Sequence, residues 1–287
     1  MKSFILAARP KTLPAAIVPV WVGCVLAYDL TGVWDVRLAL FTLLGAVFIQ
    51  IGTNFFNDAI DADKGADTDA RLGPERATAS GRLSRRTVYL CAIVSLLLAS
   101  VCGYMLIEAR GWPILLIGVA SLYFAYGYTG GPVPLAYKGL GELFVILFFG
   151  LVAVSGTTFV QTGDWHAEAW FMGLAIGCLS AVLISVNNLR DVDEDRMNSK
   201  NTLAVKWGRN AAINLVRMMT ATPYVVVMLM HDLNWSMLVY FPPFALGLFI
   251  IHRISNEAPG PQYNKYLAFA ALQLILFAAS VNLVMVL

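Results

Sequence analysis

Long apolar runs separated by short polar segments dominate the chain. A helix that crosses a bilayer needs about 20 mostly apolar residues. Runs of about that length cover residues 13–30, 38–57, 88–107, 112–129, 140–161, 169–188, 211–231, 236–252 and 265–286. The pattern predicts an all-α membrane protein with about nine transmembrane helices, built as a single polytopic domain over residues 1–287.

The composition supports this class of protein. Hydrophobic residues make up 59% of the 287 residues and charged residues only 13%, whereas soluble domains carry about 25% charged residues. Too few charges are present to cover a surface that faces water. A soluble enzyme, a disordered protein and a nucleic-acid binder are therefore excluded.

The cations gather on one side of the predicted membrane segments. Among the 20 Lys and Arg residues, only Arg37, Arg110 and Arg217 lie outside the N-terminal segment and the alternate connections. The positive-inside rule assigns the cation-rich side to the cytoplasm. We therefore expect an integral protein of a bacterial inner membrane. Its N-terminus and the loops 58–87 and 189–210 are expected to be cytoplasmic.

Two clusters of acidic residues follow the cytoplasmic ends of the second and sixth predicted spans. Their members are Asp58, Asp61, Asp63, Asp67 and Asp69 in one, and Asp191, Asp193, Glu194 and Asp195 in the other. Each is followed by a cation-x-Thr element, Arg76-Ala77-Thr78 and Lys200-Asn201-Thr202 respectively. This similarity indicates a weak internal repeat in which two half-molecules bring equivalent segments to one central cavity that opens to the cytoplasm.

The spacing within each cluster suggests a chemistry. Asn57 and Asp61 are four residues apart, and Asn187, Asp191 and Asp195 repeat that interval. On a helix this interval places side chains on one face. Stacked carboxylates repel one another unless a cation binds them, and Mg²⁺ bridges carboxylates to substrate phosphates. Ordinary hydrophilic loops are the alternative, but they do not require this spacing twice, so we favour a diphosphate held through Mg²⁺.

Several blocks of sequence resemble the UbiA superfamily of intramembrane prenyltransferases, and its 1,4-dihydroxy-2-naphthoate polyprenyltransferase branch in particular. They are Ala8-Arg9-Pro10-Lys11-Thr12-Leu13-Pro14, Gln50-Ile51-Gly52-Thr53-Asn54, Lys64-Gly65-x-Asp67, Tyr128-Thr129-Gly130-Gly131-Pro132, Gly139-Leu140-Gly141-Glu142, Asn187-Asn188-Leu189-Arg190-Asp191 and Lys200-Asn201-Thr202-Leu203. One departure is Gly65, which stands where the superfamily's first motif usually ends in Asp; Asp63 or Asp67 are the possible substitutes.

The resemblance implies Mg²⁺-dependent transfer of a polyprenyl group from polyprenyl diphosphate to 1,4-dihydroxy-2-naphthoate. The attacked ring carbon carries the carboxylate, which is lost as CO₂, and the product is a demethylmenaquinone-type precursor in menaquinone or phylloquinone biosynthesis. A site within the membrane protects the allylic cation from water. The length of the prenyl chain stays open.

The resemblance also assigns roles to residues. It implies two Mg²⁺ ions, with metal candidates Asn54, Asn57, Asp58, Asp61, Asp67, Asn187, Asp191 and Asp195, of which Asp61 and Asp191 are the expected catalytic pair. Charge and position make Arg71, Arg76, Lys138 and Lys200 candidates for the diphosphate. Arg9, Lys11 and Tyr128 are candidates for the acceptor, although anchoring at the headgroups is the favoured role of Arg9 and Lys11, and packing in the interfacial aromatic belt is the favoured role of Tyr128.

Two alternatives remain open from the sequence. Another member of the superfamily would use hydroxybenzoate or homogentisate as the acceptor. An ion-coupled transporter would also carry membrane carboxylates and a two-fold repeat, but near the bilayer midplane. The acidic clusters lie at span ends, which favours the prenyltransferase.

Overall fold

The computed structural model describes residues 2–32, 34–65, 72–230 and 235–286, and within these ranges the regular structure is helical. The helices are α1 (Lys2–Ala8), η1 (Pro10–Thr12), α2 (Pro14–Thr31), α3 (Val36–Asp63), α4 (Arg85–Arg110), α5 (Trp112–Gly127), η2 (Leu135–Tyr137), α6 (Gly141–Val145), η3 (Ile146–Val152), α7 (Ala153–Thr162), α8 (Ala167–Arg190), α9 (Val192–Met197), α10 (Leu203–Trp207), α11 (Arg209–Met230), η4 (Trp235–Tyr240), α12 (Phe241–Asn256) and α13 (Tyr263–Val286).

The predicted membrane architecture is confirmed. Eight of the described helical stretches are long and apolar enough to cross a bilayer, and α5 is a shorter apolar helix of 16 residues. Two boundaries differ from the sequence prediction. Helix α3 continues to Asp63, so Asp58 and Asp61 are helical and do not begin the loop. The fifth span is not one regular helix, because the π-helical segment η3 interrupts it between α6 and α7.

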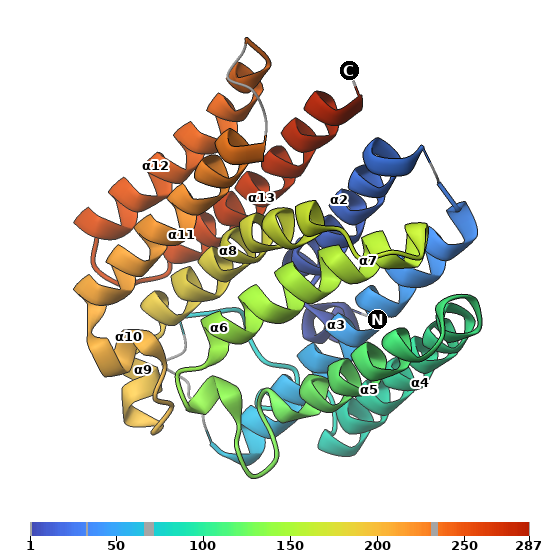
Figure 1. Cartoon of the computed structure of the whole chain (residues 1–287). Helices are drawn as coiled ribbons and strands as arrows, with labels where there is room; N and C mark the ends of the chain where they lie inside the picture. Colours follow the sequence, from blue (N-terminus) through green and yellow to red (C-terminus); the bar gives the residue numbers. More distant parts are fainter. Residues whose placement is uncertain (1, 33, 66–71, 231–234, 287) are drawn as a thin grey trace.

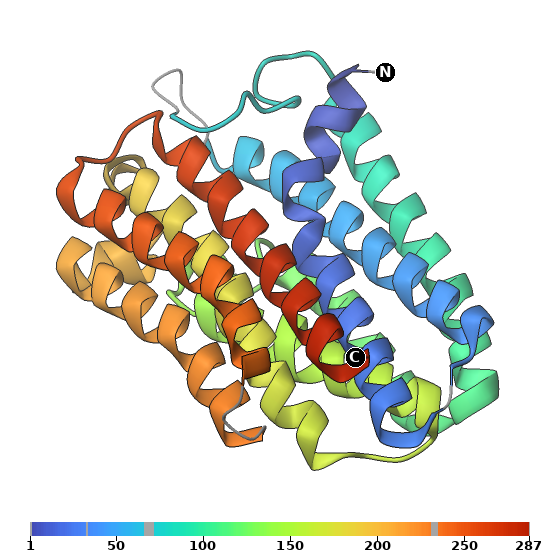
Figure 2. The same cartoon turned by 90° about the horizontal axis from the view of Figure 1, so that it is seen from above.

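The helices form two groups around a central layer (Figures 1 and 2). Helices α3, α4 and α5 pack together on one side, and α11, α12 and α13 on the other. Between them, α2 packs against α7 and α13, and α8 packs against η3, α11 and α13. Helices α3 and α8, which carry the acidic segments, both contact α2 of this layer.

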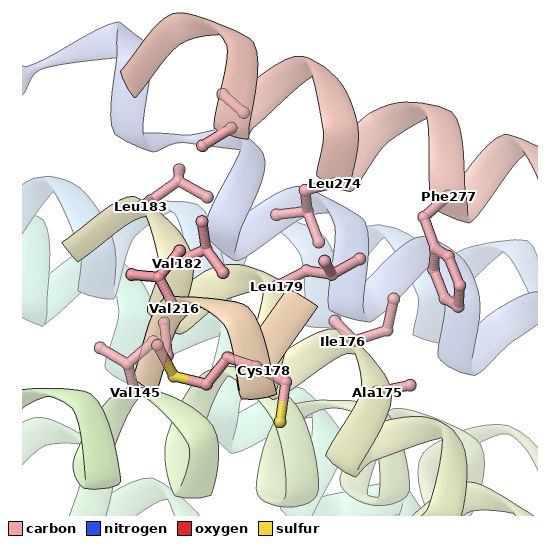
Figure 3. Close-up of a cluster of buried hydrophobic side chains, with 14 of the residues drawn as sticks. Val145, Ala175, Ile176, Cys178, Leu179, Val182, Leu183, Val216, Leu274 and Phe277 are labelled. Atoms are coloured by element: carbon pink, nitrogen blue, oxygen red, sulfur yellow. The ribbon is translucent and has the colours of Figure 1, made fainter. Parts of the chain in front are cut away.

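The main hydrophobic core surrounds α8, where Leu179 and Val182 are 1% exposed and meet side chains such as Leu274 and Phe277 of α13 (Figure 3). Facing outward instead are large apolar side chains such as Leu97, Val101 and Leu229. Helices that are apolar inside and out suit a bilayer. The chain is an integral membrane protein.

Three glycines allow η3 to approach α8 unusually closely. A Cβ atom on Gly150 would lie 2.3 Å from the carbonyl oxygen of Gly173 and 2.5 Å from the Cα of Gly177. Small residues four apart permit such backbone contact between membrane helices. The contact holds η3 against α8, and α6, which precedes η3, also packs on α8.

Candidate active site

A cavity of about 400 Å³ lies between the ends of α3 and α8. Its walls include the segment between α1 and α2, the residues after α5, the start of α6, and Asn264 at the start of α13. Of the residues that the sequence predicted for the site, Arg9, Lys11, Asn54, Asn57, Asp58, Asp61, Arg76, Tyr128, Asn187 and Lys200 line it. The predicted central cavity is thus present. Asp58 and Asp61 of the first acidic segment line it, whereas the second segment reaches it through Asn187 and Lys200, and Asp191 and Asp195 are not among the lining residues.

Asp61 is the most fully engaged carboxylate of the first segment. It is 5% exposed; its Oδ2 lies 3.1 Å from a guanidinium nitrogen of Arg76, and its Oδ1 accepts a hydrogen bond from the Tyr137 hydroxyl at 2.8 Å. Nearby, the Lys64 ammonium lies 3.8 Å from the centre of the Tyr137 ring. Burial lowers the pKa of Lys64, with Asp61 acting in the opposite direction. Asp61 is therefore surrounded by cations that could be shared with an anionic ligand.

Asp58, which lies about one helical turn before Asp61 on α3, binds the backbone of the following loop instead of a cation. Its two carboxylate oxygens accept backbone N–H groups of Ala77 at 3.1 Å and Thr78 at 2.8 Å. These bonds fasten the loop after α3 over the cavity, and they place Arg76 beside Asp61. Although Asp58 lines the cavity, its oxygens already have partners within the protein.

Asn54 and Gln50 hold the N-terminal segment in place. The Asn54 amide donates to the carbonyl oxygen of Ala8 at 2.8 Å and to the Thr12 hydroxyl at 3.0 Å, and Gln50 donates to the same hydroxyl at 3.1 Å. Arg9, within this segment, has a φ of 51°, a region that non-glycine residues rarely adopt. The bonds therefore fix a strained turn that brings Arg9 and Lys11 to the cavity.

The second acidic segment contains its own cation. Arg190, 2% exposed, donates to both carboxylate oxygens of Asp191 at 2.7 and 2.6 Å and to the Asn187 side-chain oxygen at 2.8 Å. It also donates to Asn264, which in turn donates to the backbone of Leu72. This network ties α8, α13 and the loop after α3 together.

Asp195 lies one turn further on, in α9. Its Oδ1 is 3.4 Å from the Lys200 ammonium, while its buried Oδ2 has no hydrogen-bond partner among the described residues. Burial raises the pKa of Asp195 to about 6, and the negative charges of Asp191 and Asp61 act in the same direction. The charges of both acidic segments therefore act on Asp195.

Some predicted residues stand apart from the cavity. Lys138 is exposed and its side chain does not line the cavity. Asp63 faces α4, where it pairs with Arg85 at 2.6 Å and accepts the Tyr89 hydroxyl at 2.8 Å. Asp67 and Arg71 lie outside the described residues. Asp63, one of the two possible substitutes for the Asp that Gly65 replaces, therefore contacts α4 and does not line the cavity.

Sequence reasoning gave no role to Lys64, Tyr137 or Glu142, and it counted Arg190 only as a basic loop residue. Each is a contact of the site: Lys64 and Tyr137 beside Asp61, Arg190 on Asp191, and Glu142 in the cavity wall. The positions of Lys64, Arg190 and Glu142 within the sequence blocks described above were the available signal.

The donor set suits a hard cation. Asn57, Asp61, Asn187, Asp191 and Asp195 supply amide and carboxylate oxygens, which Mg²⁺ prefers, and the unpartnered Oδ2 of Asp195 is one open ligand position. Among the described residues, no three acidic, His or Cys side chains already converge tightly enough to enclose an ion.

An apolar cavity of about 360 Å³ continues from the polar one, since both are lined by Ala15, Gln50, Thr53, Tyr128, Val145 and Phe149. The stacked rings of Phe144 and Phe148 and the neighbouring Phe124 form part of its wall. Phe124 near the end of α5 and Tyr128 just after it line this space, while Tyr123 and Tyr126 are 56% and 41% exposed.

The comparison with known proteins decides the family. The model of the UbiA prenyltransferase family matches residues 16–283. This chain belongs to the UbiA prenyltransferase family. It is 35% identical to the 1,4-dihydroxy-2-naphthoate octaprenyltransferase of Mycobacterium leprae (strain TN), covering 96% of this chain and 92% of the relative. It is 38% identical to the protein of the same name from Mycobacterium tuberculosis, covering 77% and 79%.

The fold agrees with that of solved members of the UbiA family. A UbiA homolog from Archaeoglobus fulgidus bound to GPP and Mg²⁺ superposes with a TM-score of 0.70 at 18% identity, over 99% of this chain and 100% of the other. The resemblance inferred from the sequence blocks is thereby confirmed at the level of family and fold.

Proposed function

We propose that this UbiA-family protein transfers a polyprenyl group from polyprenyl diphosphate to 1,4-dihydroxy-2-naphthoate, with loss of CO₂, to give a demethylmenaquinone-type precursor. The observation that carries this proposal is one polar cavity, bordered by two paired acidic helix ends, that continues into an apolar cavity. A diphosphate fits the first and a prenyl chain fits the second. The names of the Mycobacterium relatives support the naphthoate as the acceptor.

In this proposal the two acidic segments hold the donor's diphosphate through Mg²⁺. Asn57 and Asp61 on α3, and Asn187, Asp191 and Asp195 on α8 and α9, would bind two ions, which supply Lewis-acid stabilisation to the leaving diphosphate. Arg76 and Lys200, now paired with Asp61 and Asp195, are positioned to neutralise the remaining phosphate oxygens. Arg9 and Lys11 would attract the acceptor's carboxylate.

The site also protects its reaction. The prenyl end would lie among side chains such as Phe124 and Phe148 of the apolar cavity, which would exclude water that traps an allylic cation and whose aromatic rings would stabilise positive charge. The clustering of Lys and Arg at the site end of the helices supports a cytoplasmic orientation in a bacterial inner membrane.

A turnover assay on the purified, detergent-solubilised protein tests the function. The assay contains geranylgeranyl diphosphate and 1,4-dihydroxy-2-naphthoate, with Mg²⁺ or with EDTA, and follows product mass and released CO₂. We expect product and CO₂ only with Mg²⁺. Product from hydroxybenzoate or homogentisate instead would overturn the acceptor. Absence of diphosphate release with every acceptor would overturn the prenyltransferase assignment and favour the transporter alternative.

A further inference from the structure

Glu142 is a buried carboxylate in the cavity wall that the diphosphate site does not use. It lies in the first turn of α6, is 4% exposed, and lines the polar cavity. Its Oε1 accepts hydrogen bonds from Asn188 at 3.0 Å and Ser185 at 3.4 Å, both on α8. Its Oε2 is buried and has no hydrogen-bond partner among the described residues.

The unpartnered oxygen of Glu142 lowers the stability of the fold unless a bound ligand donates a hydrogen bond to it. A buried carboxylate that lacks both a cation and a full set of donors destabilises a fold, and none of the ion pairs found among the described residues involves Glu142. Asn188 and Ser185 fix one oxygen and thereby orient the other. The free oxygen is an acceptor for a single O–H or N–H group of a bound molecule.

The position of Glu142 selects the aromatic acceptor as that molecule. The Tyr128 hydroxyl would lie 3.0 Å from a Cβ atom on Gly141, the residue before Glu142, and Arg9 lines the same cavity as Tyr128 and Glu142. A carboxylate and a cation thus border one cavity beside Tyr128. A ligand that offers both a carboxylate and a hydroxyl matches that pair of charges.

We propose that Glu142 is the general base that removes the proton from the acceptor hydroxyl ortho to the attacked carbon; this inference rests on the proposed function. The C–O bond to diphosphate breaks and leaves the allylic cation. As the hydroxyl proton moves to Oε2, the oxygen electron pair forms C=O, and the ring carbon bonds to that cation. The ring then carries a carboxylate β to a ketone. Loss of CO₂ returns the electron pair to the ring as an aryl oxide, which recovers the proton from Glu142. The base is thus regenerated, and no oxidant or further reactant is needed.

The test compares Glu142→Gln with Glu168→Gln, a matched change at an exposed carboxylate near the start of α8. Each full-length variant is assayed for turnover and for binding of geranylgeranyl S-thiolodiphosphate with Mg²⁺. We expect Glu142→Gln to lower kcat by about 10²–10⁴-fold, the usual contribution of a general base, with affinity for the donor analogue unchanged. Glu168→Gln should match the wild type in both measurements.

A second measurement separates a base from a residue that only supports the cavity. Dihydroxynaphthoates fluorinated on the distal ring have more acidic hydroxyls and need less help in losing the proton. The kcat deficit of Glu142→Gln should therefore shrink along the series, whereas Glu142→Asp, which keeps a carboxylate, should follow the wild-type trend. If the kcat deficit of Glu142→Gln is below about threefold, or stays constant along the series, Glu142 is not the general base; the proposed function itself is unaffected by that outcome. An inactive wild type overturns the proposed function itself.

Discussion

The ends of α3 and α8 carry the same spacing of Asn and Asp, but they use it differently. At the end of α3, Asp61 pairs with Arg76 from a distant part of the loop, and Asp58 holds the backbone of that loop. At the end of α8, the cation on Asp191 is the adjacent Arg190. The first end therefore depends on a loop for its charge balance, while the second is balanced within its own helix.

This difference separates residues that bind the ligand from residues that position the others. One turn of helix places Asp58 and Asp61 side by side along α3, but only Asp61 keeps side-chain cations that a phosphate could take over. A repeat in sequence thus predicts where two segments meet, whereas the partners of each side chain determine what it does there.

The largest expected effect comes from Asp61 and Asp191, the expected catalytic pair of the two acidic segments. Asp61→Asn or Asp191→Asn keeps the size of the side chain but removes the charge that would bind Mg²⁺, so turnover should fall by about 10²–10³-fold, in line with the loss of a main electrostatic element of a site. Turnover is measured on protein that elutes as a folded species in detergent. Activity within tenfold of the wild type in both variants would contradict the two-metal arrangement.

Two lysines give the next contrast. Lys200 lines the cavity and approaches Asp195 at 3.4 Å, whereas the side chain of Lys138 is exposed away from it. Lys200→Met should raise KM for the prenyl donor by about 10–100-fold, because a hydrogen bond to a charged group contributes about 1.5–3 kcal/mol. Lys138→Met should raise KM for the prenyl donor less than Lys200→Met does. A larger increase in Lys138→Met would indicate that the diphosphate binds nearer to Lys138 than to Lys200.

The sequence predicted the fold and the residues of the candidate site better than it predicted which hydrogen bonds and ion pairs those residues make. Apolar runs of span length specify membrane helices, and four-residue spacing specifies which side chains share a face; both are local properties. That Asp58 would accept the N–H groups of Ala77 and Thr78 depends on how a loop folds back, and spacing contains no information about it. The block that contains Glu142 was visible in the sequence, but the surroundings of its side chain were hidden, because they arise from the packing of α6 against α8.

A smaller effect on turnover is expected at Asp58. Asp58→Asn replaces one of the two oxygens that accept the N–H groups of Ala77 and Thr78 with an amide nitrogen, and a buried donor left unpaired costs about 1–3 kcal/mol. The apparent Tm should therefore fall by several degrees, while kcat at low temperature stays within about tenfold of the wild type. A loss of turnover as large as that of Asp61→Asn, without a change in Tm, would place Asp58 on the metal instead.

Asn54 tests the difference between ligand-binding and positioning residues with the smallest expected effect. Its hydrogen bonds to Ala8 and Thr12 hold the strained turn that contains Arg9. In Asn54→Ala that turn loses both bonds, and Arg9 and Lys11 are no longer fixed against the cavity. KM for the naphthoate should rise about 3–10-fold, as expected for about one lost hydrogen bond, while KM for the prenyl donor and the Mg²⁺ concentration for half-maximal rate stay unchanged. A shifted Mg²⁺ requirement with an unchanged KM for the naphthoate would instead make Asn54 a metal ligand, and the two helix ends would then be more alike than their contacts indicate.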